Sequence, residues 1–365
     1  MKEFSRLLLL LLMLFALVAG FPVRAQDGPW GEAVNLSRSG AASEPFVFVG
    51  PEGELHAFWW DAFDGIMTAS QGEDGWSAPA AAPIIRTEIV GEGARAEVVR
   101  TPIAEMPTIF GGQAYAHAFW VGAPDEETGV RPFLRSRLAL GTTSWSEPAA
   151  LGEMALDWRM VTAPDGTLIL LYARPLHTAA TPAGVYVRRS TDNGATWSAA
   201  APLYETIYFR LLAPEDVHLW MTVDDAGRVY AAWDDPRLGR TFLAASADGG
   251  ESWSDVQTVG LDEGGRRARV ALAREDPFLM WEATGGGATA AGGGCALYQQ
   301  RITAPVTGTI TGTLRLSEPE RVLEDVRSCP ERAELHQGPA GDPLLVMAGE
   351  GRLSAAAWNG EQWSA

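Results

Sequence analysis

Short apolar segments separated by tight polar turns recur along the whole chain. In each case an apolar stretch is followed by a turn rich in Gly, Pro and Asp, and then by a second stretch rich in aromatic residues. Short runs of this kind, bounded by turn-forming residues, predict β-strands. The predicted pairs are 45–49 with 55–60, 107–110 with 115–120, 159–163 with 168–172, 218–223 with 229–233, 268–273 with 278–281, and 334–338 with 344–348.

Each pair is followed by a third and a fourth predicted strand. Segments 184–189 and 241–245 are examples of the third strand, and 201–206 is an example of the fourth. No segment after residue 25 shows a clear helical period, so the pattern predicts an all-β fold, a six-bladed β-propeller of four-stranded antiparallel blades. The predicted blades are roughly 40–82, 105–155, 157–208, 216–262, 266–324 and 333–365, the last completed by 30–37.

One turn motif, Ser-x-Asp-x-Gly-x-x-Trp, occurs twice, at 190–197 and at 246–253. Its Asp carboxylate can accept hydrogen bonds from the amides of its own turn, and its Gly can adopt a backbone angle that other residues resist. Its Trp can bury a large ring behind the turn. The motif therefore indicates a locked hairpin without chemistry of its own. The residues concerned are Ser190, Asp192, Gly194, Trp197, Ser246, Asp248, Gly250 and Trp253.

The two ends of the repeat array suggest how the ring closes. The sequence stops at Trp363–Ser364–Ala365, so the sixth unit lacks a fourth strand of its own. Segment 30–37, which begins with Trp30–Gly31, has the pattern of that missing strand. We expect residues 33–37 to pair beside 353–358 as the outer strand of the last blade, which would remove two exposed sheet edges.

The N-terminal segment has the features of a signal peptide. Lys2 and Arg6 flank an apolar run at 7–19, and small residues precede Gln26. We predict a signal peptide at 1–25, with cleavage after Ala19 as the alternative, and a single domain at 26–365. The protein is then secreted or periplasmic, and no further long apolar run predicts a membrane span.

Composition narrows the classes of partner. The formal net charge of −18 argues against nucleic acid or an anionic membrane surface as the partner. The two cysteines, Cys295 and Cys329, are expected to form a disulfide in an exported chain. Two thiols are too few for a metal site and no other ligands cluster nearby, so we expect no metal. We also expect no cofactor, and we expect the protein to be a monomer.

The two turn motifs, the strand ends of the type Leu-His-Ala-Phe-Trp-x-Asp and the six units together resemble the sialidase superfamily, also called BNR-repeat or Asp-box propellers. The resemblance covers essentially the whole chain after the signal segment. It implies an arginine triad, a Tyr–Glu nucleophile pair and an Asp acid/base in active members. Glu44, before Pro45, stands where the first arginine would be. Tyr204 and Tyr208 lie near Glu205 in a segment that does not match the nucleophile pair, so no catalytic set is assigned.

In such propellers the Asp-box turns lie on one face, and ligands approach the opposite face. Carboxylates and arginines there could serve glycoside chemistry, bind sugar hydroxyls or hold a hard cation such as calcium. Two tryptophans, Trp60 and Trp120, could stack on a sugar. Asp–Arg pairs at strand ends are more often structural. The candidate residues are Asp61, Asp64, Arg159, Arg174, Asp234, Asp235, Arg237, Arg269 and Glu282.

From these observations we predict a non-catalytic binding module for glycans or cell-surface polymers. The alternatives are a glycoside hydrolase of exo-sialidase type with a diverged active site, and a protein-interaction scaffold. Arg159, Arg174, Arg237 and Arg269 would form a carboxylate-binding cluster only if at least three of these four converge near the propeller axis. An arginine-poor, aromatic centre would instead favour neutral sugars.

Overall fold

The computed structural model describes residues 33–365 except 92–94, 126, 179–180, 260–264, 274–275, 285–294, 303–313, 323–331, 338–341, 350–351, 361 and 365. The chain divides into two units, Met1–Arg38 and Ser39–Ala365. Only residues 33–38 of the first unit are described, and they form no strand. Every strand described below belongs to the second unit.

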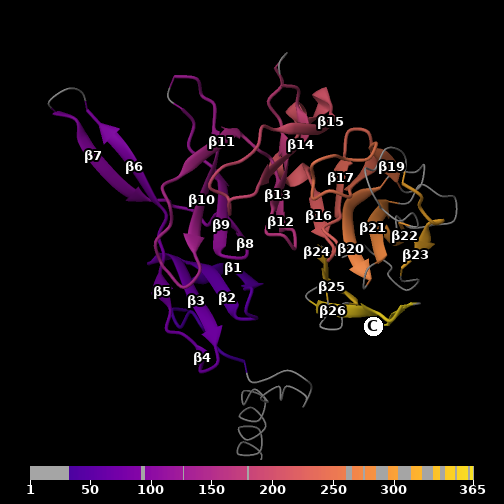
Figure 1. The fold of residues 1–365 in the computed structure, drawn as a ribbon, viewed down its shortest axis with the longest axis horizontal. Coiled ribbons are helices and arrows are strands. Elements are labelled where there is room, and N and C mark those ends of the chain that lie inside the picture. The colour runs from indigo at the N-terminus through magenta and orange to yellow at the C-terminus, as the bar shows by residue number, and fades with distance from the viewer. Residues whose placement is uncertain are drawn as a thin grey trace, which may run out of the picture. The chain divides into compact units, whose positions relative to one another are not determined.

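The second unit is built from six antiparallel sheets, which are the blades of the propeller (Figure 1). Blade one contains β1 (Ala42–Val49), β2 (Leu55–Asp61), β3 (Gly65–Gly72), β4 (Gly75–Trp76) and the short β5 (Ala80–Ala81), which also pairs with β3. Blade two contains β8 (Thr108–Gly111), β9 (Tyr115–Val121), β10 (Pro132–Ala139) and β11 (Ala149–Glu153). Blade three contains β12 (Trp158–Thr162), β13 (Leu168–Arg174), β14 (Gly184–Ser190) and β15 (Ala201–Glu205).

The remaining blades follow the same order. Blade four contains β16 (Leu219–Val223), β17 (Val229–Asp235), β18 (Arg240–Ser246) and β19 (Gln257–Val259). Blade five contains β20 (Arg266–Ala273), β21 (Asp276–Thr284), β22 (Cys295–Arg301) and β23 (Glu320–Arg321). Blade six contains β24 (Arg332–Gln337), β25 (Pro343–Gly349), β26 (Arg352–Trp358) and β27 (Trp363–Ser364). The predicted all-β, six-bladed propeller of four-stranded antiparallel blades is confirmed.

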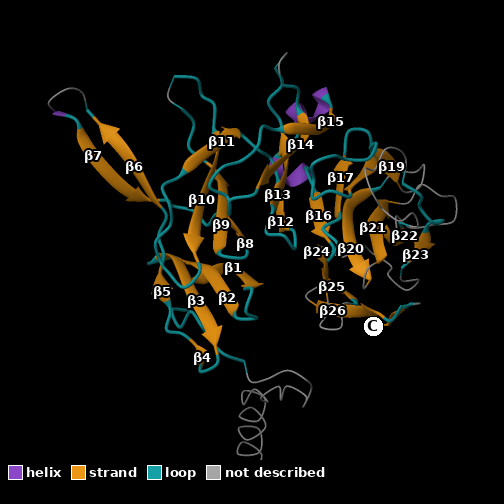
Figure 2. Ribbon diagram, viewed as in Figure 1, coloured by secondary structure: helices purple, strands orange, loops and turns teal. Residues whose placement is uncertain are grey.

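Three elements lie outside this repeat. A two-stranded hairpin, β6 (Ile85–Val90) with β7 (Glu97–Pro102), links blades one and two and projects away from them (Figure 1). Two short 3₁₀ helices, η2 (Ile207–Leu211) and η3 (Pro214–Asp216), link blades three and four (Figure 2). The repeat pattern predicted none of the three, because they lie between its units.

Tryptophans fill the seams between blades. Trp145 of blade two donates its indole N–H to the carbonyl of Ala82, at the end of blade one, at 2.8 Å. Trp197 of blade three meets Phe119 of blade two edge-on, with ring centroids 6.1 Å apart. Trp363 of blade six meets Phe278 of blade five in the same way at 6.0 Å. In each of these seams the recurring Trp therefore packs on the preceding blade, which explains its regular spacing in the sequence.

The predicted ring closure by residues 33–37 is not shown. The place beside β26 is taken by β27, with Ala357 opposite Ser364, and Trp30 lies outside the described residues. The signal segment 1–25 and Cys329 also lie outside them, so the predicted cleavage and the disulfide remain predictions. Within the described part of the chain, no helix has the length and hydrophobicity that crossing a membrane requires.

Candidate functional site: an arginine pocket at the inner strands

A pocket of about 240 Å³ lies where the first strands of blades three to six begin. The Asp-box turns join third and fourth strands, at the opposite end of each blade. The pocket is therefore on the face where the sequence analysis expected a ligand. Its lining residues are Arg159, His218, Leu219, Trp220, Arg267, Ala268, Arg269, Ala333 and Glu334. We call it the arginine pocket.

Arginines of β20 surround a single buried carboxylate, that of Glu282 on β21. Arg269 Nη2 lies 3.2 Å from Glu282 Oε1, while Arg266 Nε and Arg267 Nη1 each lie 3.5 Å from Oε2. In a regular strand, residues 266 and 267 would point to opposite faces. A bulge between Arg266 and Arg269, together with a φ of 52° at Arg267, brings the three guanidinium groups together.

The charges around Glu282 do not balance. The carboxylate is fully buried, whereas the side chains of Arg266 and Arg267 are 47% and 32% exposed. Burial lowers the pKa of Arg269 below its usual range, and the neighbouring Glu282 opposes that shift. One carboxylate thus orients three cations, of which Arg267 and Arg269 line the pocket.

Arg159 reaches the same pocket from blade three. Its Nη1 donates to Asp157 Oδ1 at 2.7 Å, and Asp157 Oδ2 accepts the backbone N–H of Leu219 at 2.9 Å. Burial raises the pKa of Asp157, and the Arg159 charge opposes the shift. Asp157 therefore holds Arg159 in place while tying blade three to the start of blade four.

His218 and Asp234 form a pair at the edge of blade four. His218 Nδ1 lies 3.3 Å from Asp234 Oδ2, at ion-pair distance but without the alignment of a good hydrogen bond. The Asp234 carboxylate is 2% exposed, and its Oδ1 has no partner among the described residues. The His218 side chain is 36% exposed and lines the arginine pocket beside the partly buried Trp220.

The structure brings four of the predicted candidates to this pocket. Arg159 and Arg269 line it, whereas Asp234 and Glu282 lie behind it and hold His218 and the arginines. Sequence reasoning missed the lining residues Arg267, His218, Trp220 and Glu334. The sequence could have identified His218, because this residue, like Arg159 and Arg269, lies near the start of the first predicted strand of a blade.

Two candidate aspartates lie elsewhere and shape turns. Asp61 is 2% exposed, and its Oδ1 accepts the amides of Phe63 and Asp64. Asp235 is fully buried, accepts the amides of the two residues after Pro236 and receives the Tyr204 hydroxyl at 3.1 Å. Asp64 is exposed. These three residues do not line the arginine pocket.

The other candidate arginines and tryptophans are also outside the pocket. Arg174 is buried and donates to the carbonyls of Leu176 and Thr181. Arg237 Nη2 reaches the carbonyl of Leu211 at 3.3 Å. Trp120 lines a separate pocket of about 380 Å³ at the base of the β6–β7 hairpin. The side chain of Trp60 is partly buried, and it packs against the core of blades one and two.

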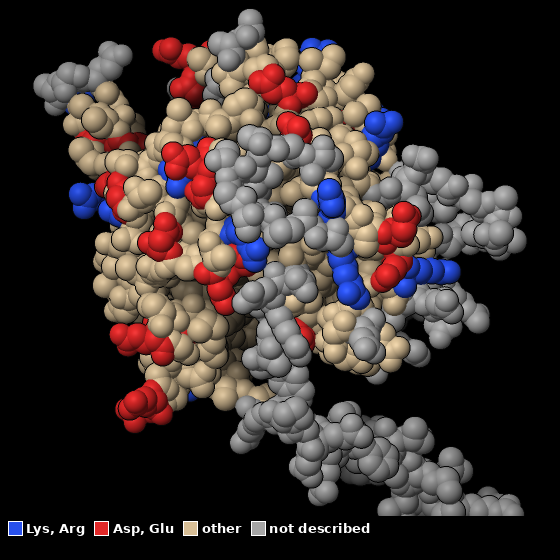
Figure 3. Space-filling view, turned by 45° about the vertical axis from the view of Figure 1, so that its right-hand side comes forward, with Lys and Arg blue, Asp and Glu red and all other residues tan. Residues whose placement is uncertain are grey.

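Glutamates line the neighbouring cavity. This cavity, of about 630 Å³, is bounded by β1, β8, β24 and β25 and includes Glu44 at the β1 bulge. Glu334 lines both this cavity and the arginine pocket, so the two are adjacent. The surface drawn in Figure 3 shows acidic side chains widely spread, with basic side chains in small groups among them.

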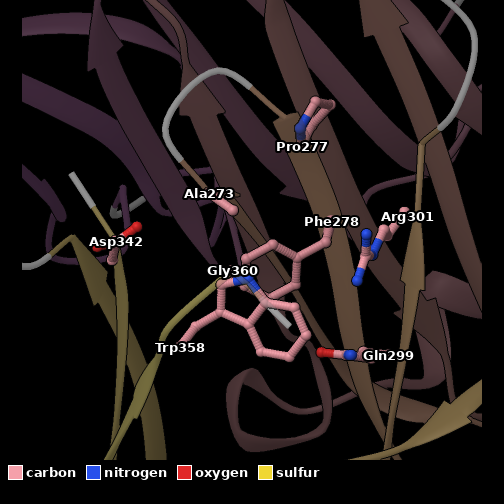
Figure 4. A pocket seen from close by; sticks show the side chains of 8 residues that line it. All are labelled: Ala273, Pro277, Phe278, Gln299, Arg301, Asp342, Trp358 and Gly360. Atoms are coloured by element: carbon pink, nitrogen blue, oxygen red, sulfur yellow. The ribbon is translucent and has the colours of Figure 1, made fainter. Parts of the chain in front are cut away.

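A further pocket of about 170 Å³ lies on the Asp-box face, between blades five and six (Figure 4). Two of its polar side chains are already engaged: Arg301 stacks 5.4 Å from the Trp358 ring centre, and Gln299 accepts the indole N–H of Trp363 at 2.9 Å. This pocket is part of an aromatic seam. Across the described residues, no cluster of three or more His, Cys, Asp or Glu side chains could hold a metal ion.

Several known protein structures resemble this fold. Two ulvan lyase structures, described as a new polysaccharide lyase family, PL25, align with TM-scores of 0.55 at 13% identity. They cover 89% and 92% of this chain, and 81% and 83% of their own chains; the second is described as bound to -[GlcA(1-4)Rha3S]-. Hydrazine synthase from Kuenenia stuttgartiensis aligns with a TM-score of 0.51 at 9% identity, covering 85% of this chain and 75% of its own.

The NanB sialidase of Streptococcus pneumoniae aligns with a TM-score of 0.46 at 10% identity, covering 86% of this chain and 67% of its own. No family model and no curated protein sequence matches this chain. At identities this low, structural similarity shows the fold alone. With its two Asp boxes and six antiparallel blades, the chain has the fold of a six-bladed β-propeller.

Proposed function

We propose that the protein binds acidic glycans, and that the arginine pocket recognises the carboxylate groups of their sugars. The observation that carries this proposal is the convergence of Arg159, Arg267 and Arg269 on one pocket. Guanidinium groups bind carboxylates through paired, charge-assisted hydrogen bonds. The partly buried Asp157 and the fully buried Glu282 orient these groups before a ligand arrives, which lowers the entropic cost of binding.

The rest of the pocket suits a sugar. Trp220 offers an apolar ring beside the cations, a surface on which the C–H face of a sugar ring can pack. The net charge of −18 repels a polyanion at long range. Salt screens that repulsion beyond about 8 Å, so the guanidinium groups that line the pocket can act on a bound carboxylate at physiological ionic strength. An extracytoplasmic location, which the N-terminal segment predicts, would bring the pocket to polysaccharides outside the cell.

The comparisons support a carbohydrate ligand without specifying it. The ulvan lyase complex holds a chain written with GlcA, an acidic sugar. Hydrazine synthase has a similar fold, but its name refers to hydrazine and not to a carbohydrate. The fold alone therefore does not determine the ligand. The proposal therefore depends on the arginines and not on the similarity.

A glycoside hydrolase is less well supported. Hydrolysis of a glycosidic bond commonly uses two carboxyl groups that flank the bond. Among the described residues that line the arginine pocket, Glu334 is the single carboxylate, and its Oε2 lies 3.2 Å from His336 Nε2. A binding function needs no second carboxylate.

Calorimetric titration with polygalacturonate and alginate tests the proposal. We expect Arg159→Gln and Arg269→Gln to weaken binding roughly tenfold or more, because each removes a charged hydrogen-bond donor. Arg100→Gln is the matched control, since it makes the same charge change on the exposed β7 strand and should bind like the wild type. Methyl-esterified pectin, which lacks the charge, should bind weakly. Equal binding of the esterified and free polymers would contradict the proposal.

A further inference from the structure

We infer that the arginine pocket also performs chemistry on its ligand: His218, oriented by Asp234, is the general base of a β-elimination that cleaves 4-linked uronate polymers. This inference rests on the proposed function, because the base must act on a carbon that a bound carboxylate positions. It goes further by assigning a reaction, a substrate class and a base that the sequence analysis did not identify.

The position of the pair suits a base: His218 Nδ1 lies at ion-pair distance from a buried carboxylate, without a formed hydrogen bond to it. Asp234 is almost completely buried, and its Oδ2 faces His218 Nδ1 at 3.3 Å. A carboxylate at Nδ1 favours the tautomer with the proton on that nitrogen, which leaves a lone pair on Nε2. Within the described part of the chain, Nε2 of His218 has no hydrogen-bond partner, and the side chain lines the pocket. Base contacts of this length commonly tighten when a substrate binds.

The arginines supply the second requirement of the reaction. The proton on C5 of a uronate lies next to the carboxylate, and removing it places negative charge on that group. Arg159, Arg267 and Arg269 line the same pocket and would stabilise this charge as it develops. One base and a cluster of cations are therefore sufficient, and the carboxylate pair of a hydrolase is not needed.

The step balances without a co-reactant. Nε2 of neutral His218 takes the C5 proton, and the electrons of the C5–H bond form a C4=C5 double bond. The C4–O bond breaks, its electron pair leaves with the oxygen of the departing sugar, and that oxygen takes a proton from water. The imidazolium then returns its proton to the resulting hydroxide. No water is added to the products, which separates elimination from hydrolysis.

The test uses the full-length protein with polygalacturonate, alginate and a 4-linked glucuronan. We expect products whose unsaturated ends absorb in the ultraviolet and whose masses show no gain of water. His218→Gln should lower kcat by about 100-fold or more while the calorimetric affinity is retained. Asp234→Asn should lower kcat with little change in KM. His177→Gln, an exposed histidine on the loop after β13, is the matched control and should retain the wild-type rate.

Each outcome decides the inference. A wild-type protein that binds the polymers but forms no unsaturated ends overturns the elimination and leaves the proposed function standing. Products that have gained water, or full activity in His218→Gln, also overturn it. Absence of binding overturns the proposed function first. If His218→Gln melts early, His218→Ala with added imidazole replaces it, and restored turnover would support the role of His218 as the base.

Discussion

At the scale of single residues, His117 is a buried histidine that packs between blades two and three and that the folded protein keeps uncharged. It lies on β9 with 3% exposure. A Cβ added at Gly112 or at Gly194, the Asp-box glycine of the next blade, would come within 2.8 Å of its ring. Burial, followed by the charges of Arg137 and Arg135, lowers the pKa of His117 to about 3. The folded protein therefore keeps this histidine neutral.

The lowered pKa predicts an acid-sensitive fold. Below the ordinary histidine pKa of 6.5, the unfolded chain binds a proton at His117 that the folded chain does not. Stability should therefore fall as the pH drops from 6.5 towards 3, by at most about 1.4 kcal/mol per pH unit from this group. Urea unfolding at a series of pH values measures the slope. We expect a flatter slope in His117→Gln and an unchanged one in the exposed His336→Gln; equal slopes in all three proteins would contradict the prediction.

The hydrogen bonds within the turns were predictable from the sequence, but the contacts that the turns make with other blades were not. The motif at 190–197 predicted that Asp192 would accept hydrogen bonds from its own turn, and it accepts the Thr196 amide at 2.9 Å. These bonds, led by the Thr196 hydroxyl, lower the pKa of Asp192 to about 2. That His117 of another blade would contact Gly194 depends on how the blades pack, which no local pattern encodes.

At the scale of elements, arginines join each Asp box to the blade before it. Arg135 of β10 donates to the carbonyls of Gly194 and Ala195 at 2.6 and 2.7 Å. Arg189 of β14 repeats the contact one blade further on, with Nε 2.8 Å from the carbonyl of Gly249. The carbonyl groups exposed by each tight turn thus receive their donors from a neighbouring blade.

Removing one of these clamps should loosen a specific turn. We expect Arg135→Gln to lower the free energy of unfolding by roughly 1.5–3 kcal/mol, because it removes charged donors from two carbonyls. Hydrogen exchange should also become faster at 190–197, while 246–253, held by Arg189, stays protected. Arg100→Gln on the exposed β7 strand serves as the control for lost charge. Uniform exchange across both turns would show that the contact is not a clamp.

Strand pairs were predictable, because alternating apolar positions and turn residues occur in every blade. The register of one pair could even have located the His218–Asp234 contact, since Val223 opposite Val229 places residue 218 beside residue 234. The arrangement on β20 could not have been predicted. Strict alternation separates Arg266 from Arg267, and only the bulge with its positive φ brings both to Glu282.

At the scale of the whole molecule, the inner strands form an arginine-rich region and a glutamate-lined region that meet at Glu334. Blades three and five contribute Arg159, Arg267 and Arg269, whereas blades one and six contribute Glu44 and Glu334. The condition set from the sequence, that at least three of Arg159, Arg174, Arg237 and Arg269 converge, is not met by these four residues. Two of the four expected arginines take part, and Arg267 is the third.

This division predicts that the protein does not hydrolyse sialosides despite its arginines. Glu44, which the sequence resemblance led us to expect in the place of the first triad arginine, lines the adjacent cavity and would repel a carboxylate there. Tyr204 is poorly placed to act as the nucleophile of a sialidase. It lies on the outer strand β15 and donates its hydroxyl to Asp235, and burial together with the Asp235 charge raises its pKa, which makes it a poorer nucleophile.

A fluorogenic sialoside, assayed beside an active sialidase, measures this outcome. We expect no turnover above the background rate, with the sialoside at most a weak competitor of polyuronate binding through its own carboxylate. Turnover that Arg269→Ala or Asp61→Asn abolishes would contradict the prediction, because it would mean that the arginines act with Asp61 in a hydrolytic site. Asp61 is 2% exposed and accepts hydrogen bonds from its own turn, and hydrogen bonds led by Ser39 lower its pKa. A carboxyl group held ionised in this way is poorly suited to donate a proton to a leaving group. We therefore expect no release of the fluorophore above the background rate.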